Sequence, residues 1–454
     1  MLVLRKEDGR LEEAEIEVVM VPRWRQPLSG FCALILGLLV ALATWWVFAD
    51  VRFALQHFVF GWYPEVASLL GGWGLLVAVW QAWLENYPCS KLRKPWLVGV
   101  AGTALNLVLV WFMVYVVFYQ LVGSLVPVAS YPKLLSLGLP VETALYLSSS
   151  ATGMVTGATF SFGLLWVAGS MFWPLYHEKQ PKRGVYAVAL SLAIGLTAWW
   201  LILLPPVSQM AQYSAAIMAL MYLSELQPAA SILYSVLTYY YTISWFYLNA
   251  EALRRLNMTQ WVIFFALLTM LTWEYEPWIR LKRQPLIGVA AFISCTVLGA
   301  VSGLVLSQVV YTPPIPPSYV WAALGQAALA PMAEVAREGA RWTAPLVLAV
   351  FLIIAEFILY FYFDNWPKKY SKPVNMAVRT IVVVLAGLLM LYVYYLASAS
   401  IIGDPDVVTM LTYPILFLDP RPLTNPLPFQ LWLLWILLLH GYIWRKWPVW
   451  KPLT

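Results

Sequence analysis

The chain has 454 residues, of which 62% are hydrophobic and only 11% are charged. Soluble domains carry about 25% charged residues, so a soluble globular fold is excluded, because it could not bury so much apolar surface. Apolar runs of about 20 residues recur along the chain, and an α-helix needs that length to cross a bilayer core of roughly 30 Å. The runs are continuous rather than alternating, which disfavours a transmembrane β-barrel. We therefore predict an all-α polytopic integral membrane protein.

Residues 1–29 are predicted to form a cytoplasmic segment. A cleavable signal peptide needs a basic start and an apolar centre. This segment instead carries four glutamates in close order, at positions 12, 13, 15 and 17. It therefore reads as a charged lead-in to the first apolar run.

A short motif recurs between the apolar runs, as in the stretch FWPLYHEKQPKRG at 172–184. It contains an aromatic residue, a proline, two or three basic residues, a second proline and often a glycine. The first proline is expected to end one helix, and the second suits the first turn of the next helix. The first prolines of the six copies are Pro22, Pro88, Pro174, Pro277, Pro367 and Pro448.

The spacing of this motif predicts repeated two-helix hairpins. The interval between copies is irregular but near 85 residues, roughly the length of two spans and an outer loop. The motif loops and the N-terminal segment together hold 21 of the 28 Lys and Arg residues. Basic residues concentrate in cytoplasmic loops, so we expect the motif loops and both termini to be cytoplasmic, in the cell membrane. The net charge of +6 then reflects orientation, and no nucleic-acid partner is expected.

About twelve transmembrane helices are predicted within a membrane domain at 30–446, followed by a cytoplasmic tail at 447–454. An alternative has ten spans, with part of 205–257 lying flat on the outer surface. The twelve predicted spans are 30–49, 64–84, 96–122, 151–173, 185–204, 207–224, 229–250, 258–275, 286–310, 343–364, 374–400 and 428–446.

Four residues are the predicted substrate-binding or coupling positions. Glu356 lies in the middle of an apolar run, where an ionisable group is costly and therefore points to function; the alternative is a protonated carboxyl that holds two helices together. Gln81 and Asn106 could line a cavity or join helices through hydrogen bonds. Tyr241 belongs to an aromatic band at 239–247, which suits either an interface belt or a quinone headgroup.

The small-residue stretch at 148–163 contains the pair Gly153 and Gly157, and a second such pair is Gly299 and Gly303. Close helix packing is the default reading of both pairs. The alternative for the first is a helix that lines a substrate path and lets a ligand approach its backbone.

Catalytic, metal and cofactor sites are not indicated by the sequence. The three histidines are too scattered for a haem core or a zinc site, and the three cysteines show no metal or disulfide spacing. There is no P-loop or dinucleotide fingerprint. Asp404 and Asp406 form a pair in the last outer loop. They could belong to an enzyme that acts on lipid-linked substrates, but aspartates on both sides of a proline are typical of a turn.

Two functions remain open. The first is a transporter or permease for a small, apolar or amphipathic substrate, coupled to protons through Glu356, since transporters are commonly built from repeats with a site between them. The second is a haem-free membrane subunit of a larger, quinone-linked redox complex. Membrane lipids are expected partners, and the cytoplasmic basic loops could dock a protein partner.

Overall fold

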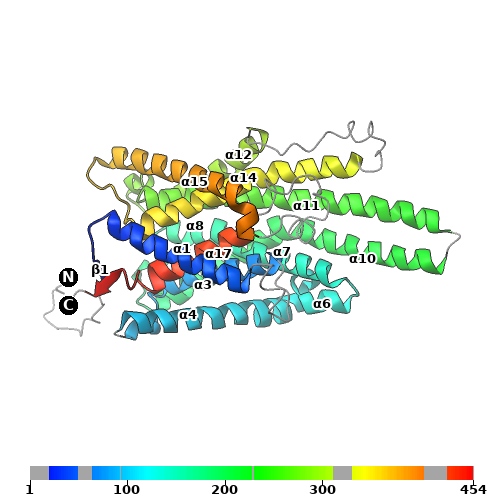
Figure 1. Cartoon of the computed structure of the whole chain (residues 1–454), viewed down its shortest axis with the longest axis horizontal. Helices are drawn as coiled ribbons and strands as arrows, with labels where there is room; N and C mark the ends of the chain where they lie inside the picture. Colours follow the sequence, from blue (N-terminus) through cyan, green and yellow to red (C-terminus); the bar gives the residue numbers. More distant parts are fainter. Residues whose placement is uncertain are drawn as a thin grey trace.

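The computed structural model describes residues 20–49, 64–92, 94–227, 230–309, 330–402 and 427–452. Over these residues the protein is a bundle of α-helices with one small two-stranded sheet. The helices run along the long axis of the molecule (Figure 1), and the sheet lies at one end of the bundle. The motif loops join the helices at this end, which we call the motif side.

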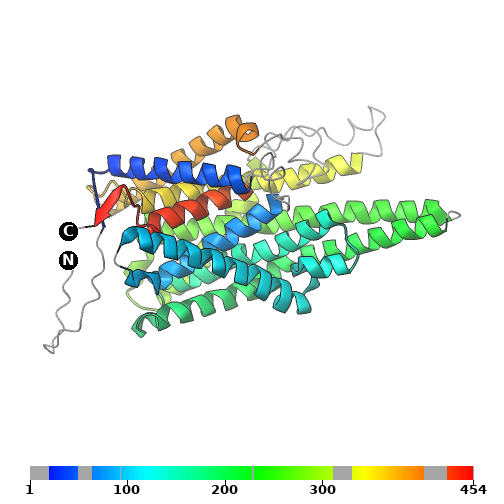
Figure 2. The same ribbon diagram turned by 60° about the horizontal axis from the view of Figure 1, so that its bottom comes forward.

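Five helices begin within one residue of the second proline of a motif and lie on the outside of the bundle (Figures 1 and 2). Only 17–33% of the residues in their most apolar windows are buried. Exposed apolar surface on this scale is suited to lipid rather than water. These outer helices are α1 (Leu28–Phe48), α4 (Pro95–Trp111), α9 (Lys182–Ala198), α12 (Leu286–Val309) and α15 (Lys372–Ile402).

Five inner helices return to the motif side, and several continue as short π-helical or α-helical segments. Burial reaches 78% in the apolar window at 143–169 and 72% in that at 341–361. The inner helices are α3 (Pro64–Trp83); α7 (Val141–Ala158) with η4 (Thr159–Leu164) and α8 (Leu165–Gly169); α11 (Ser231–Leu267) with η8 (Leu268–Thr272); α14 (Ala330–Phe361); and α17 (Leu427–Leu438) with η11 (Leu439–Ile443).

The inner helices form a closed ring in the order of the chain. Helix α3 packs against α7, the α7–η4 helix against α11, α11 against α14, α14 against α17, and α17 back against α3. Large buried side chains such as Trp73 and Ile354 come from this ring. The hydrophobic core of the molecule is therefore the wall of the ring.

The outer helices occupy equivalent places around the ring. Each packs against the two inner helices that precede it in ring order: α9 contacts η4 and α3, α12 contacts α11 and α8, and α15 contacts α14 and η8. Glycine at the start of an outer helix permits the approach, since a Cβ at Gly184 would lie 2.9 Å from the Trp83 carbonyl oxygen and one at Gly30 would lie 2.8 Å from that of Tyr362. The first two outer helices, α1 and α4, follow the same rule, because they pack against α17 and η11 near the end of the chain.

The two ends of the described chain meet. Strand β1 (Met20–Pro22) pairs antiparallel with β2 (Trp450–Pro452), so that Val21 lies opposite Lys451. These strands belong to the first and sixth copies of the motif. The sheet thus joins the start of the ring to its end.

The motif loops share one backbone geometry. Each inner helix ends in two consecutive residues with positive φ, such as Glu85 and Asn86, two residues before the first proline. In the loop after α3, the Asn86 N–H returns to the carbonyl of Gln81 at 2.7 Å. Left-handed residues at a helix C-terminus satisfy its last carbonyls in this way, so these residues rather than the proline end the helix. The other pairs are Met171–Phe172, Glu274–Tyr275, Asp364–Asn365 and Arg445–Lys446.

The second proline of the motif acts as expected, at the N-cap or first turn of the outgoing helix. In three copies a glutamine precedes it, and its side-chain oxygen accepts a hydrogen bond from the backbone N–H of a glycine four residues later. The three pairs are Gln26–Gly30, Gln180–Gly184 and Gln284–Gly288. Two of these glutamines also donate to the end of an inner helix, Gln180 to the Trp83 carbonyl and Gln26 to that of Tyr362.

The predicted boundaries near residues 204 and 250 are wrong. Helix α9 continues through η6 (Trp199–Leu203) into α10 (Leu204–Leu226), so 182–226 is a single helix of 45 residues. Helix α11 likewise runs unbroken for 37 residues. Pro205 and Pro206 lie in the first turn of α10, where the preceding π-helical segment accommodates them. Nor does this region lie flat: α10 and α11 form an antiparallel stalk that extends the bundle away from the motif side (Figure 1).

Other elements differ less from expectation. Helices α1, α3, α12 and α17–η11 begin and end within three residues of predicted ranges. Helix α14 starts at Ala330, so residues 330–342 are continuous with the span predicted at 343–364, despite Pro345. The remaining short elements are η1 (Cys89–Lys91), η2 (Phe112–Val122), α5 (Gly123–Leu125), η3 (Pro127–Ala129), α6 (Tyr131–Ser136), η5 (Leu175–His177) and η9 (Trp278–Leu281).

Seven helices of the described chain are long and apolar enough to cross a membrane, and two shorter apolar helices accompany them. By length and composition, the protein is therefore an integral membrane protein. The structure does not show the twelve separate spans that were predicted from the sequence.

Candidate functional site

The interior of the helix ring contains two cavities. Residues from all five inner helices line each of them. The first, which we call the ring chamber, has a volume of about 140 Å³, and the second, the motif-side cavity, about 910 Å³. Pockets between helices of a bundle are common ligand sites.

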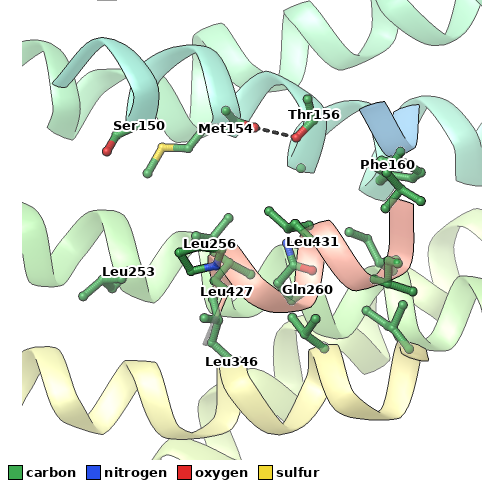
Figure 3. Close-up of a pocket in the computed structure, with 18 of the residues that line it drawn as sticks. Ser150, Met154, Thr156, Phe160, Leu253, Leu256, Gln260, Leu346, Leu427 and Leu431 are labelled. Atoms are coloured by element: carbon green, nitrogen blue, oxygen red, sulfur yellow. Dashed lines mark hydrogen bonds between the residues drawn. The ribbon is translucent and has the colours of Figure 1, made fainter. Parts of the chain in front are cut away.

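The ring chamber is mainly apolar, and none of the described residues that line it is charged. Figure 3 shows Met154 and Thr156 of α7 facing Leu256 of α11 and Leu431 of α17 across the chamber. An engineered apolar cavity of roughly 150 Å³ holds a benzene molecule. The chamber therefore accommodates a single ring or a short branched chain.

The small-residue stretch on α7 forms one wall of this chamber. A Cβ added at Gly153 would meet no atom within 4 Å, and one at Gly157 would only touch Leu256 and Gln260 at 3.5 and 3.8 Å. The pair Gly299 and Gly303 instead packs tightly against α11. Helix packing, the default prediction, therefore holds for the second pair, whereas the first pair faces a cavity.

Polar groups of the chamber are few and incompletely paired. The Ser149 hydroxyl is buried and has no hydrogen-bond partner among the described residues. Gln260 is 7% exposed, and no hydrogen bond of its side-chain amide is found there either. Tyr146 and Asn249 satisfy each other, because the tyrosine hydroxyl donates to Asn249 Oδ1 at 2.7 Å. Buried polar groups are normally hydrogen-bonded, so Ser149 and Gln260 offer free capacity to a ligand.

The motif-side cavity differs in chemistry. Its apolar wall ends in a charged rim near the motif loops. Two ion pairs lie at this rim: Arg183 with Glu85 at 2.8 Å, and Lys446 with Asp364 at 3.0 Å. This cavity presents polar groups at its mouth and apolar groups deeper in the ring.

A narrow apolar layer divides the two cavities. Leu267 of α11 and Phe357 of α14 line both, and both side chains are buried. The cavities therefore approach each other inside the ring at these two residues. Apolar constrictions of this kind can close a pore by excluding water.

Gln81 and Asn106 lie together in a buried network between α3, α4 and α17. The Asn106 amide donates to Gln81 Oε1 at 2.9 Å, Gln81 donates to the Gly102 carbonyl at 2.9 Å, and Trp435 Nε1 donates to Asn106 Oδ1 at 2.9 Å. Neither amide is among the residues lining the ring chamber or the motif-side cavity. Their contacts join three helices.

Glu356 is fully buried on α14, next in sequence to the constriction residue Phe357. It does not line either cavity. It lies close enough to Cys295 of α12 for an electrostatic interaction. Neither carboxyl oxygen has a hydrogen-bond partner among the described residues. An unpaired carboxyl in such a place is costly, which keeps it a candidate for function.

Tyr241 lies far along the stalk rather than near the other predicted positions. Its ring packs edge-on against that of Tyr213, with centroids 5.2 Å apart, and so helps to join α10 to α11. The structure thus brings together only Gln81 and Asn106 of the four predicted residues. Asp404 and Asp406 lie outside the described residues.

Metal-binding geometry is not found in the described part of the chain, which holds no group of three or more His, Cys, Asp or Glu side chains suited to a metal ion. His440 Nδ1 instead lies 3.1 Å from the Tyr362 hydroxyl. His57 lies outside the described residues.

From the sequence, the helix at 148–163 was predicted mainly to pack against its neighbours, with a ligand path as the alternative. The useful signal was the run of Ser, Thr and Gly at 148–163, whose small side chains leave space where large apolar ones would fill the ring. The partners across the chamber come from distant parts of the chain, and single-sequence patterns do not reveal such pairs.

Comparisons with known proteins provide no relative: no protein family, no curated protein and no solved structure matches this chain.

Proposed function

We propose that this protein is a membrane transporter or permease for a small, apolar or amphipathic substrate, and that its path follows the interior of the helix ring. The observation that carries the proposal is the pair of cavities whose linings share the buried residues Leu267 and Phe357. A site near mid-membrane, reached from either side in turn, is the common plan of transporters. The uncharged chamber suits a substrate with little net charge.

The architecture behind this proposal is five two-helix units arranged in a ring. The cyclic order of contacts and the recurring left-handed turns support internal repeats. We infer ten crossings, one outer and one inner helix for each unit, with the motif loops and both termini in the cytoplasm. The basic residues concentrated in the motif loops support this orientation.

Proton coupling through Glu356 forms part of the proposal. The residue neighbours the constriction in sequence, and its carboxyl oxygens have no partner among the described residues. A change in its protonation would alter the electrostatics between α14 and α12. Protonation of Glu356 would in this way change how the helices pack around Phe357.

Transport is tested in liposomes containing the purified chain. The measured quantity is the transbilayer movement of a fluorescent neutral amphiphile that crosses protein-free membranes slowly. The wild type should accelerate this movement, and Leu267→Trp should return it to the protein-free rate by filling the constriction. Leu298→Trp, on the lipid-facing side of α12, provides the matched control and should transport like wild type. Equal rates for Leu267→Trp and wild type would contradict the proposed path.

A membrane subunit of a larger complex is the second candidate, and the stalk favours it. Tyr222, Ile232 and Tyr240 near its tip are 63%, 80% and 63% exposed. Such aromatic and aliphatic surface is typical of protein contacts. In this reading the partners belong to a quinone-linked redox assembly, and a second protein contact could form at the basic motif loops. Native purification in mild detergent followed by identification of co-purifying chains tests it; recovery of the chain with lipid alone would contradict it.

A further inference from the structure

We propose that the ring chamber is a binding site for an uncharged, mostly apolar molecule that carries at least one hydrogen-bonding oxygen, and that Ser149 and Gln260 provide two separate hydrogen-bonding positions for such an oxygen. Because it names the class of substrate, this inference rests on the proposed transport function. Binding itself can be measured without transport, so the two ideas can fail separately.

Chamber size limits the ligand. A volume of about 140 Å³ resembles the roughly 150 Å³ of an engineered cavity that holds benzene. A ring or a short stretch of chain therefore fits, whereas a hydrated sugar or a bulky headgroup does not. The apolar side chains around it, including Leu256 and Leu431 (Figure 3), supply the contacts for such a body.

Charge excludes other ligands. No described lining residue carries a charge, and an ion buried without a partner is strongly disfavoured. The nearest polar groups are hydroxyls and amides, which bind neutral oxygen atoms well. A carboxylate or an ammonium group would find no counter-ion among the described residues of the chamber.

Two polar side chains that line the chamber have unused hydrogen-bonding capacity. Ser149 is 3% exposed, and its hydroxyl has no partner among the described residues. Gln260 faces the chamber from α11 beside Gly157, at 3.8 Å from the position of an added Cβ. A serine hydroxyl and a glutamine amide can each donate and accept, so each of the two positions suits an alcohol, ether or carbonyl oxygen.

The open face of Gly153 lets a ligand reach the α7 backbone. A Cβ there would touch nothing within 4 Å, so a larger side chain can enter the chamber without displacing the helix. In contrast, a side chain at Gly299 would collide with Val262. Gly153 is therefore the position from which the chamber can be filled deliberately.

The test uses photolabelling of the full chain in lipid nanodiscs. The probes are a short-chain alcohol with a diazirine near its hydroxyl end and the matching alkane, both small enough for a chamber of about 140 Å³. Adducts are mapped by peptide mass spectrometry. In the wild type, the alcohol should label chamber residues such as Met154 and Leu256 about fivefold more than the alkane does, the factor expected for one hydrogen bond. Both probes should label the lipid-facing sides of α1 and α12 equally.

Three variants decide the outcome. Gly153→Leu should abolish labelling of the chamber while labelling of α1 and α12 persists. Ser149→Ala combined with Gln260→Leu should reduce alcohol labelling of the chamber to the level of the alkane. Leu385→Trp, at a position of α15 that is 62% exposed and outside the chamber, is the control and should label like wild type.

The proposal is overturned if the alcohol labels α1 and α12 but not the chamber, or if Gly153→Leu leaves chamber labelling unchanged. Equal chamber labelling by alcohol and alkane in the wild type would also overturn it. Should Gly153→Leu fail to fold, Gly153→Ala gives a smaller decrease in labelling on the same site. Chamber labelling without transport would retain the binding site and reject the proposed transport function.

Discussion

Trp435 Nε1 donates a hydrogen bond of 2.9 Å to Asn106 Oδ1, and this bond joins the last inner helix to the second outer helix, 329 residues apart in the chain. Asn106 in turn donates to Gln81 on α3. One buried amide thus holds three helices around the point where the end of the ring meets its beginning.

Replacing Asn106 should weaken the bundle. Asn106→Ala leaves the Trp435 indole N–H and Gln81 Oε1 without these partners, and we expect a loss of about 2 kcal/mol in the free energy of unfolding. The measurement is thermal unfolding of the detergent-solubilised chain. Gln120→Ala, at an exposed position on η2, is the control and should leave the melting temperature unchanged. A melting temperature unaffected by Asn106→Ala would contradict a structural role.

Glu356→Gln should abolish proton coupling of transport without lowering the stability of the protein. Because neither carboxyl oxygen has a partner among the described residues, the neutral side chain should not lower the melting temperature. Transport in liposomes should then stop responding to an imposed proton gradient. Glu225→Gln, at an exposed position on α10, should respond like wild type. An undiminished response in Glu356→Gln would remove the residue from the proposed coupling.

Cys89 should react slowly with alkylating reagents. Its burial in the turn after α3 raises the pKa of the thiol above its usual value, although a backbone hydrogen bond opposes this. The thiolate is the reactive form, so at mildly alkaline pH less of it is present than for a free cysteine. The rate should rise with pH until the raised pKa is passed.

Site-resolved mass spectrometry of iodoacetamide adducts gives the rate at Cys89. In the variant Cys89→Ser with Lys91→Cys, the exposed thiol on the same turn should react faster at every pH below the raised pKa. Equal rates at the two positions would show that Cys89 is as accessible as its neighbour.

Two arginines of the motif side should differ in their effect on stability. Arg379 is 5% exposed and donates to the buried Thr272 carbonyl as well as to Glu274, whereas Arg183 is 32% exposed and pairs only with the exposed Glu85 among these groups. The exposed ion pairs contribute about 0.5 kcal/mol each, whereas a buried hydrogen bond from a charged group contributes about 2 kcal/mol. Arg379→Met should therefore lower the melting temperature clearly and Arg183→Met only slightly. Similar shifts in the two variants would contradict this ranking.

The sequence revealed the helical class and the start of each outer helix, because a proline with a following apolar run has local causes. It did not reveal where the stalk begins. The segment 182–226 is a single helix apolar enough to cross a membrane, whereas α11 is not among the helices that meet this criterion, so hydropathy alone does not locate the stalk. Charged residues lie at its base, where Glu251 pairs with Arg254 and Arg255, and Arg255 also donates to the Ile202 carbonyl.

The candidate site was harder to foresee for a physical reason. Glu356 attracts attention because its charge is unusual in an apolar run, whereas Ser149 and Gly153 are ordinary residues whose importance depends on what they fail to touch. A cavity is produced by five helices at once. Its walls combine residues from Leu75 to Leu434, and no local pattern records that they share a space.

The pairing of β1 with β2 has a consequence for the order of the polypeptide. Since Met20 lies opposite Pro452, a short linker could join these two residues, and a new start could be introduced within another motif loop, such as that after α8. In such a circular permutant the same helices would be synthesised from a different starting point. Membrane insertion would then have to begin with α9, which follows α1, α3, α4 and α7 in the chain, so the permutant would separate the contribution of the finished ring from that of the order of its assembly.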